Sequence, residues 1–231
     1  MKKERGSVAV IEGIDGSGKT KQTSLLLDRL NKEGYQTATL DFPQYEKNFF
    51  GELCGVYLRG ECGDAVELSP YLASLPYALD RWESSPLLWQ WIREGKVVVM
   101  NRYTTANIGH QGSKIADREK RWAFFKWLEK MEYDIFKIPR PDIVALLKIN
   151  PDITADLIGR KGKRTYLSTP KDMHEANIKH QRDTLECFLE AAQANPDIWR
   201  VIDCEDGQGE ILPAEVISEK IWQAVEPALT G

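Results

Sequence analysis

The sequence has no apolar run long enough to cross a membrane, which takes about 18 consecutive apolar residues. The first apolar run, Val8 to Ile11, stops at Glu12 and is too short for the core of a secretory signal peptide. The four cysteines do not form the closely spaced pairs of a zinc site, so we expect reduced thiols. These absences lead us to expect a soluble protein of the cytoplasm.

An excess of basic residues is also missing. The chain has 31 lysines and arginines against 35 aspartates and glutamates, a net charge of −4, which argues against a surface devoted to nucleic acid or anionic lipid. Its 231 residues contain no internal repeat, low-complexity tract or interdomain linker, and 42% of them are hydrophobic. We therefore expect one domain, residues 1–231, with a substantial core.

Five short runs rich in Val, Ile and Leu predict strands at residues 8–14, 37–42, 97–100, 143–149 and 199–202. Because these runs do not alternate with polar residues, they are typical of parallel strands buried on both faces. Helical patterns separate them at residues 19–31, 117–136, 172–194 and 213–228. The helix at 117–136 should bury one stripe of apolar residues, Phe124, Leu128, Met131 and Ile135. The order predicts an α/β fold, a doubly wound parallel sheet with helices on both faces.

Two serine-proline pairs indicate two further helices. Ser69-Pro70 places a capping residue before a proline at the first helical position, and Ser85-Pro86 repeats the pattern before a helix that should end at Gly95. Pro76 lies inside the first of these helices, where it should cause a kink or a new start.

Residues 13–20, Gly-Ile-Asp-Gly-Ser-Gly-Lys-Thr, fit the phosphate-binding pattern G-x-x-x-x-G-K-[ST] between a predicted strand and a predicted helix. The glycines let backbone N–H groups surround a phosphate at the helix N-terminus. We expect ATP on this loop, with Lys19 at the β- and γ-phosphates and the Thr20 hydroxyl on Mg²⁺. The full expected ATP set is Gly13, Asp15, Gly16, Ser17, Gly18, Lys19 and Thr20. A glycine-rich tight turn is the alternative, and the guanine-reading pattern N-K-x-D is absent.

Three later segments, residues 41–45, 77–82 and 101–112, follow or lie between the predicted strands, where open α/β sheets bind ligands. Together with the phosphate loop they resemble thymidylate kinases, P-loop enzymes that phosphorylate dTMP with ATP. The likeness rests on Glu12 to Thr20, Phe42-Pro43-x-Tyr45, Tyr77 with Arg81, Asn101-Arg-Tyr103, Asn107 to Gln111, Pro141-Asp142, the basic stretch Arg160 to Arg164, and Glu175. It extends over residues 7–226 and implies a homodimer.

The resemblance implies a role for each matching residue on the dTMP side. Tyr77 would stack on thymine, Arg81 would hydrogen-bond the base edge, and Arg102 would hold the dTMP phosphate. Asp15 would face the sugar 3′-hydroxyl. Further dTMP contacts are expected from Phe42, Pro43, Tyr45, Asn107, Gln111 and His110, the last as a donor rather than a metal ligand. As alternatives, Tyr77 could be a core aromatic residue and Arg102 a structural ion-pair partner.

The basic stretch holds four cations, Arg160, Lys161, Lys163 and Arg164, in five residues of an acidic chain. We expect a small mobile lid at about residues 158–171, from which Arg160 and Arg164 close over ATP and stabilise the transferring phosphoryl group. The expected catalytic set is therefore Lys19, Arg102, Arg160, Arg164 and Asp15. A solvated basic loop or a nucleic-acid contact is the alternative for this stretch.

Two departures from the family pattern keep other functions open. Asn101 stands where the family has aspartate, and Asn150 where many relatives have it, which leaves a weaker metal site, compensation by Asp15, or an inactive homologue. Asp41 could act as the base of a deoxynucleoside kinase, whose hydroxyl acceptor must lose a proton. A P-loop switch protein is the third interpretation, although it needs no acceptor pocket.

Overall fold

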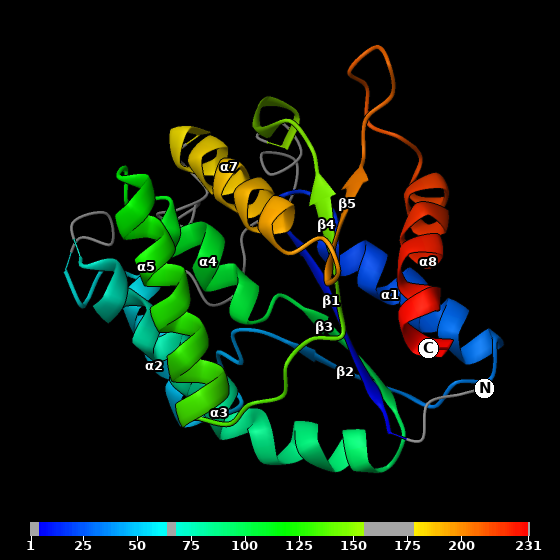
Figure 1. The fold of residues 1–231 in the computed structure, drawn as a ribbon, viewed down its shortest axis with the longest axis horizontal. Helices are drawn as coiled ribbons and strands as arrows, with labels where there is room; N and C mark the ends of the chain where they lie inside the picture. The colour runs from blue at the N-terminus through cyan, green and yellow to red at the C-terminus, as the bar shows by residue number, and fades with distance from the viewer. Residues whose placement is uncertain (1–4, 64–67, 155–177, 231) are drawn as a thin grey trace.

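The computed structural model describes residues 5–63, 68–154 and 178–230. At its centre is a parallel sheet of five strands in the order β2-β3-β1-β4-β5. The strands are β1 (Ser7–Gly13), β2 (Thr37–Asp41), β3 (Val97–Asn101), β4 (Ile143–Lys148) and β5 (Trp199–Asp203). On one side of β1 the chain goes first to the edge strand β2 and returns to β3, and on the other side β4 and β5 follow in order. The predicted doubly wound parallel sheet is confirmed (Figure 1).

Helices cover both faces of the sheet, because alternate side chains of each inner strand point to opposite sides. Ala9 and Ile11 pack with α1 (Lys19–Lys32) and α8 (Ala214–Thr230). Val8 and Val10 pack with α3 (Pro70–Arg93) and α7 (Ile178–Ala194). Figure 1 shows α1 and α8 on one side of the strands and the other helices across from them. No helix among the described residues combines the length and the apolar character that a membrane span requires.

The prediction that every strand is buried on both faces is wrong at the edges of the sheet. β1 and β3 are buried along their whole length, but several residues of β2 and β5 are exposed. The reason is position: an edge strand has a neighbour on one side only, and the covering helices do not reach all of it. Composition alone did not distinguish the edge strands from the inner ones.

The two helices predicted from the serine-proline pairs are one continuous helix, α3, with Pro76 and Pro86 inside it. Proline at position 86 cannot donate to the carbonyl of Trp82 four residues earlier. The Ser85 hydroxyl donates to that carbonyl instead, at 2.8 Å. The local sequence therefore supplies a substitute hydrogen bond where the prediction placed a helix start.

The predicted long helix at 117–136 is α5 (Arg118–Glu129), continued by a π-helical segment, η1 (Lys130–Ile135). Phe124, Leu128 and Met131 are buried as expected, whereas Ile135 is 63% exposed. A π-turn holds more residues than an α-turn, so side chains after it rotate away from the stripe that the α-helical spacing predicts. Glu132, four residues after the buried Leu128, lies on the buried side and is 1% exposed.

Two short helices complete the surroundings of the site, and neither was predicted. They are α2 (Phe49–Leu58) and α4 (Thr104–Gly112), each directly downstream of a strand's carboxyl end or its loop. α4 lies against α7, and a Cβ at Gly109 would come within 2.4 Å of the Phe188 ring. Glycine at this position thus allows the two helices to approach closely. The first residues of the helix predicted at 172–194 lie outside the described part of the chain.

Candidate active site

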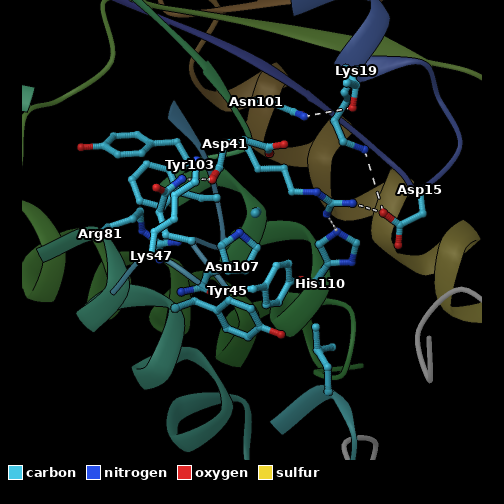
Figure 2. A pocket seen from close by; sticks show the side chains of 18 of the residues that line it. Asp15, Lys19, Asp41, Tyr45, Lys47, Arg81, Asn101, Tyr103, Asn107 and His110 are labelled. Carbon is cyan, nitrogen blue, oxygen red and sulfur yellow. Dashed lines mark hydrogen bonds and ion pairs between the residues drawn. The ribbon is translucent and has the colours of Figure 1, made fainter. Parts of the chain in front are cut away.

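A cavity of about 500 Å³ opens at the carboxyl ends of β1, β2 and β3. Most of the residues expected at the two nucleotides line it: Asp15, Gly16, Gly18, Lys19, Thr20, Phe42, Pro43, Tyr45, Tyr77, Arg81, Arg102, Asn107, His110 and Gln111. Gly13 and Ser17 support the loop without lining the cavity, and Arg160 and Arg164 lie outside the described residues. Figure 2 shows Lys19, Asn101 and Asp15 toward one end and Arg81 with Asn107 toward the other.

The phosphate loop begins where β1 ends. Gly13 has a φ of +152°, and a Cβ there would lie 2.8 Å from Ser17 Oγ and 2.9 Å from the Leu147 carbonyl oxygen. Gly18, with a φ of +89°, precedes the first residue of α1. Both positions need glycine, the first for space and the second for its left-handed backbone. The loop therefore turns sharply into a helix N-terminus, the arrangement that binds phosphate.

Lys19 lies inside the curve of this loop and is 7% exposed. Its ammonium donates to the carbonyl oxygens of Gly13 at 2.9 Å and Ile14 at 2.8 Å, and lies 4.0 Å from Asp15 Oδ1. These contacts hold a positive charge at the mouth of the helix N-terminus, where the helix dipole adds to it.

The Asp15 carboxylate contacts side chains from three parts of the chain. Its Oδ1 accepts a hydrogen bond from Arg102 Nη2 and lies near Lys19, while its Oδ2 accepts from Gln181 Nε2 at 3.4 Å. The Asp15 backbone N–H donates to Gln181 Oε1 at 3.1 Å. The carboxylate is thus fixed between two cations and an amide that comes from α7.

Arg102 directly follows β3 and has a φ of +64°, a left-handed backbone that costs a non-glycine residue roughly 1–2 kcal/mol. Its backbone N–H donates to the Ile11 carbonyl, which holds it in this conformation. Nη1 lies 2.7 Å from His110 Nε2. Because a guanidinium only donates, Nε2 is the acceptor, and the hydrogen of the neutral ring is on Nδ1. The strained backbone aims the guanidinium across the cavity toward the phosphate loop.

The Thr20 hydroxyl, at the start of α1, accepts a hydrogen bond from Asn101 Nδ2 at 3.2 Å. Asn101 is the last residue of β3, and its Oδ1 is buried with no hydrogen-bond partner among the described residues. Glu12, fully buried, accepts from the Gly13 N–H and from the Thr105 hydroxyl at 2.6 Å. These contacts join the phosphate loop to β3 and α4.

A buried carboxylate on α3, that of Asp80, anchors the loop that follows β2. Asp80 accepts from the Gln44 backbone N–H at 3.0 Å and from Asn48 Nδ2 at 2.8 Å. Burial raises the pKa of the Asp80 carboxyl above its ordinary value, and the hydrogen bonds from Asn48 and Gln44 oppose that rise. The loop that carries Pro43 and Tyr45 into the cavity is therefore fastened to the helix that carries Tyr77.

At the far end of the cavity, Arg81 is 2% exposed and makes a two-pronged ion pair with Glu132 of η1. Nε donates to Oε2 and Nη2 to Oε1, both at 2.6 Å. Tyr77, one turn earlier on α3, is half-buried and forms a T-shaped pair with Tyr57, with ring centroids 5.8 Å apart. An aromatic face and a guanidinium thus line the same end of the cavity.

Comparisons with known proteins agree with this geometry. The family model for thymidylate kinase matches residues 11–212. The chain belongs to the thymidylate kinase family. It is 27% identical over 205 residues to a thymidylate kinase of Mycobacterium tuberculosis, a match that spans 87% of this chain and 93% of the relative. It is 29% identical over 165 residues to a thymidylate kinase of Schizosaccharomyces pombe, 71% of each chain.

The fold agrees as well. A solved thymidylate kinase of Candida albicans superposes with a TM-score of 0.73 at 22% identity, over 96% of this chain and 92% of that one. With the family model and the consistent relatives, this gives the chain the α/β fold of thymidylate kinases and their activity, phosphorylation of thymidylate.

Sequence reasoning missed three residues that shape this thymidylate kinase site. Gln181 and Glu132 contact the predicted residues Asp15 and Arg81, at separations of 166 and 51 residues. Asp80 contacts Gln44, which lies between the predicted Pro43 and Tyr45. Gln181 and Glu132 belong to no short motif, and Asp80 lies in the segment 77–82 without a role of its own in the prediction. A usable signal did exist for one of them, since a carboxylate beside an apolar helix stripe, as Glu132 is beside Met131, indicates a buried partner of opposite charge.

Proposed function

We propose that this cavity holds ATP and dTMP end to end and that the phosphoryl group crosses between Lys19 and Arg102. The observation that carries the proposal is that both cations reach the same carboxylate oxygen, Asp15 Oδ1. Phosphoryl transfer between two phosphates brings several negative charges together, and catalysis consists mainly of positioning and neutralising them. Lys19 on the donor side and Arg102 on the acceptor side would together position the phosphates and neutralise their charge.

The acceptor phosphate belongs at Arg102 in this proposal. His110 and Asp15 fix the plane of the guanidinium, and planar guanidinium groups donate well to phosphate oxygens. Because the dTMP phosphate arrives ionised, its oxygen attacks the γ-phosphorus without a general base. Asp15 stays at the sugar side, as the family resemblance implied.

The base belongs at the opposite end. Tyr77 offers a face for stacking, which contributes on the order of 1–3 kcal/mol per base, and Arg81 with Asn107 offers polar contacts to the base edge. Phe42, Pro43, Tyr45 and Gln111 complete the wall. The cavity is thus apolar and aromatic where a base would lie and basic where phosphates would lie.

A Mg²⁺ ion fits beside the phosphate loop. Within the described residues no group of three or more His, Cys, Asp or Glu side chains could hold a metal. Nucleotide-bound Mg²⁺ instead takes phosphate oxygens and waters together with one or two protein oxygens. The Thr20 hydroxyl and the buried, unpartnered Asn101 Oδ1 are such oxygens. When bound, the ion would neutralise charge on the ATP phosphates.

Arg160 and Arg164 remain proposed donor-side catalytic cations on the strength of the sequence alone. If they neutralise the transferring group, Arg160→Ala and Arg164→Ala should each lower kcat by roughly 10³-fold. A change within twofold for both variants would contradict the assignment.

A deoxynucleoside kinase is the competing function, because Asp41 at the end of β2 lines the cavity and could take a proton from a hydroxyl. One coupled assay separates the candidates: ADP release from Mg-ATP with dTMP, thymidine, dUMP, dCMP or no acceptor. We expect turnover with dTMP. Turnover with thymidine alone would favour the rival, and acceptor-independent hydrolysis would favour a switch protein.

We also propose a homodimer formed through α3. Apolar side chains are exposed around the middle of this helix: Trp82 at 47%, Phe49 at the start of α2 at 71%, and Ile135 of η1 at 63%. The Phe49 N–H contacts Glu83 of α3 at 3.4 Å, and the Trp82 ring meets Phe136. An apolar patch of this kind is typical of an interface. Light scattering should give a dimer, and Trp82→Glu should give a monomer.

A cytoplasmic location is the last part of the proposal. All four cysteines are free thiols, three of them buried. Reduced thiols are typical of a cytosolic protein.

A further inference from the structure

The π-helical segment η1 holds a carboxylate in the interior of the protein. Glu132 is 1% exposed, and both of its oxygens accept hydrogen bonds from Arg81 at 2.6 Å. Burying two charges costs desolvation that a two-pronged pair only about offsets. Single π-turns inside helices occur frequently at functional sites. The position of Glu132 therefore needs a reason beyond stability.

The same carboxylate also reaches Asn107 on α4. Asn107 Nδ2 donates to the Ser74 carbonyl oxygen at 3.2 Å and to Glu132 Oε1 at 3.5 Å. A carbonyl and a carboxylate only accept, so they fix which end of the Asn107 amide is the nitrogen. Both hydrogens of that nitrogen point away from the ligand, and Asn107 therefore presents its oxygen to the cavity that it lines.

Glu132 thus fixes the position of Arg81 and supports the orientation of Asn107. It holds the Arg81 guanidinium, which can only donate, and together with the Ser74 carbonyl it keeps Asn107 as an acceptor at the same end of the cavity, where Figure 2 shows both residues. A 4-keto pyrimidine offers the complementary pair, an O4 acceptor and an N3–H donor. A 4-amino pyrimidine offers the reverse, an N4 donor and an N3 acceptor.

We propose that Glu132 is the positioning residue that makes this site select 4-keto over 4-amino pyrimidine nucleotides. The inference rests on the proposed placement of the base at Arg81 and Asn107. A purely structural link between α3 and η1 would stabilise the fold without deciding which base is phosphorylated.

The decisive variant is Glu132→Gln. A glutamine offers one acceptor and one donor end. Both Glu132 oxygens accept from Arg81, so in either orientation of the glutamine amide its NH₂ group faces an Arg81 N–H and breaks one of the two hydrogen bonds. The guanidinium is then no longer held in position to donate to the base edge. The expected readout is the ratio of kcat/KM for dTMP to that for 5-methyl-dCMP, two substrates that differ only in the 4-substituent and the N3 proton. We expect this ratio to fall at least tenfold, with the KM for ATP unchanged within twofold.

Two further variants keep the test sharp. Glu129→Gln makes the same charge change at an exposed position on the preceding turn and should leave the ratio unchanged. Glu132→Asp keeps the negative charge next to Arg81 but shortens the side chain by one methylene, so it disturbs the two-pronged pair with less effect on folding. This variant should lower the ratio at least threefold.

The melting temperature of each variant identifies any that fail to fold. A folded Glu132→Gln protein whose ratio stays within twofold of the parent overturns the inference. If that variant does not fold, Glu132→Asp decides, and a ratio within twofold of the parent overturns the inference. A parent enzyme without turnover on dTMP would instead contradict the proposed function, so the two failures are distinct.

Discussion

Gln181 holds Asp15 through two hydrogen bonds. Its amide oxygen accepts a hydrogen bond from the Asp15 backbone N–H at 3.1 Å, and its amide nitrogen donates to Asp15 Oδ2 at 3.4 Å. The two residues are 166 positions apart in the chain. Gln181 is buried on α7 and does not line the cavity. It therefore acts on the reaction only by holding the carboxylate that lies between Lys19 and Arg102.

Replacing Gln181 by alanine should lower kcat with dTMP about tenfold, because one hydrogen bond contributes on the order of 1 kcal/mol and Asp15 would then move toward its two cations. Steady-state kinetics with both substrates measures the effect. Gln193→Ala, at an exposed position of the same helix, is the matched control and should have no effect. An unchanged kcat in a folded Gln181→Ala protein would show that catalysis does not need the Gln181–Asp15 hydrogen bonds.

Arg102→Lys should lower kcat/KM for dTMP by about 100-fold and leave the KM for ATP within twofold. Lysine keeps the charge but loses the planar fork that contacts Asp15 and His110 together. A loss of 100-fold corresponds to about 2.7 kcal/mol, within the range for charged hydrogen bonds. Arg140→Lys at an exposed site provides the control. A loss below threefold would place the dTMP phosphate elsewhere.

Asn101 should govern the Mg²⁺ requirement. Asn101→Ala releases the Thr20 hydroxyl and removes the buried oxygen, so the Mg²⁺ concentration for half-maximal activity should rise about fivefold or more. Asn101→Asp adds a negative charge and should lower it. Mn²⁺ affinity in the presence of ADP, followed by electron paramagnetic resonance, checks both variants without turnover. Equal affinities in the three proteins would exclude this residue from the metal site.

Gly109→Ala should destabilise the fold by roughly 1–3 kcal/mol, the usual cost of overpacking. The added Cβ would meet the Phe188 ring at 2.4 Å. Urea unfolding measures the change, and adding Phe188→Leu should recover part of it. Gly55→Ala in α2 is the matched control, because the nearest atom there is the mobile end of Arg59 at 3.2 Å. Equal destabilisation by both alanines would mean that helix contact is not the cause.

His180 should make the fold less stable in mild acid. Burial lowers the pKa of its ring to about 4, with help from the charge of Lys114 and against that of Asp183. Between pH 6.5 and 4 the unfolded chain binds a proton that the folded chain refuses, so stability falls as the pH falls through this window. Urea unfolding at pH 7 and pH 4.5 should show an extra loss of about 2 kcal/mol relative to His180→Gln. Parallel pH profiles of the two proteins would contradict this.

The phosphate loop was predictable because its information is local. Its glycines, Lys19 and Thr20 are adjacent in the chain, and the strand before and the helix after them follow from short apolar patterns. The residues proposed to contact dTMP could be assigned to one cavity only through the order and spacing of several motifs. Gln181 and Glu132 were not predictable as site residues, because their contacts cross between elements that no local pattern pairs.

Local sequence patterns gave wrong predictions at two places in the helices. Ser85 replaces the hydrogen bond that Pro86 removes, so α3 continues through a predicted start. The π-turn of η1 exposes Ile135, against the spacing that the sequence presents.

The sequence by itself determined the inner strands, the phosphate loop and the family, because periodicity and adjacent motifs depend on neighbours along the chain. Only the tertiary structure decided that Asp15 joins Lys19, Arg102 and Gln181, and that Glu132 orients Arg81 and Asn107. Those contacts depend on how the helices pack around the sheet, and packing is a property of the whole chain.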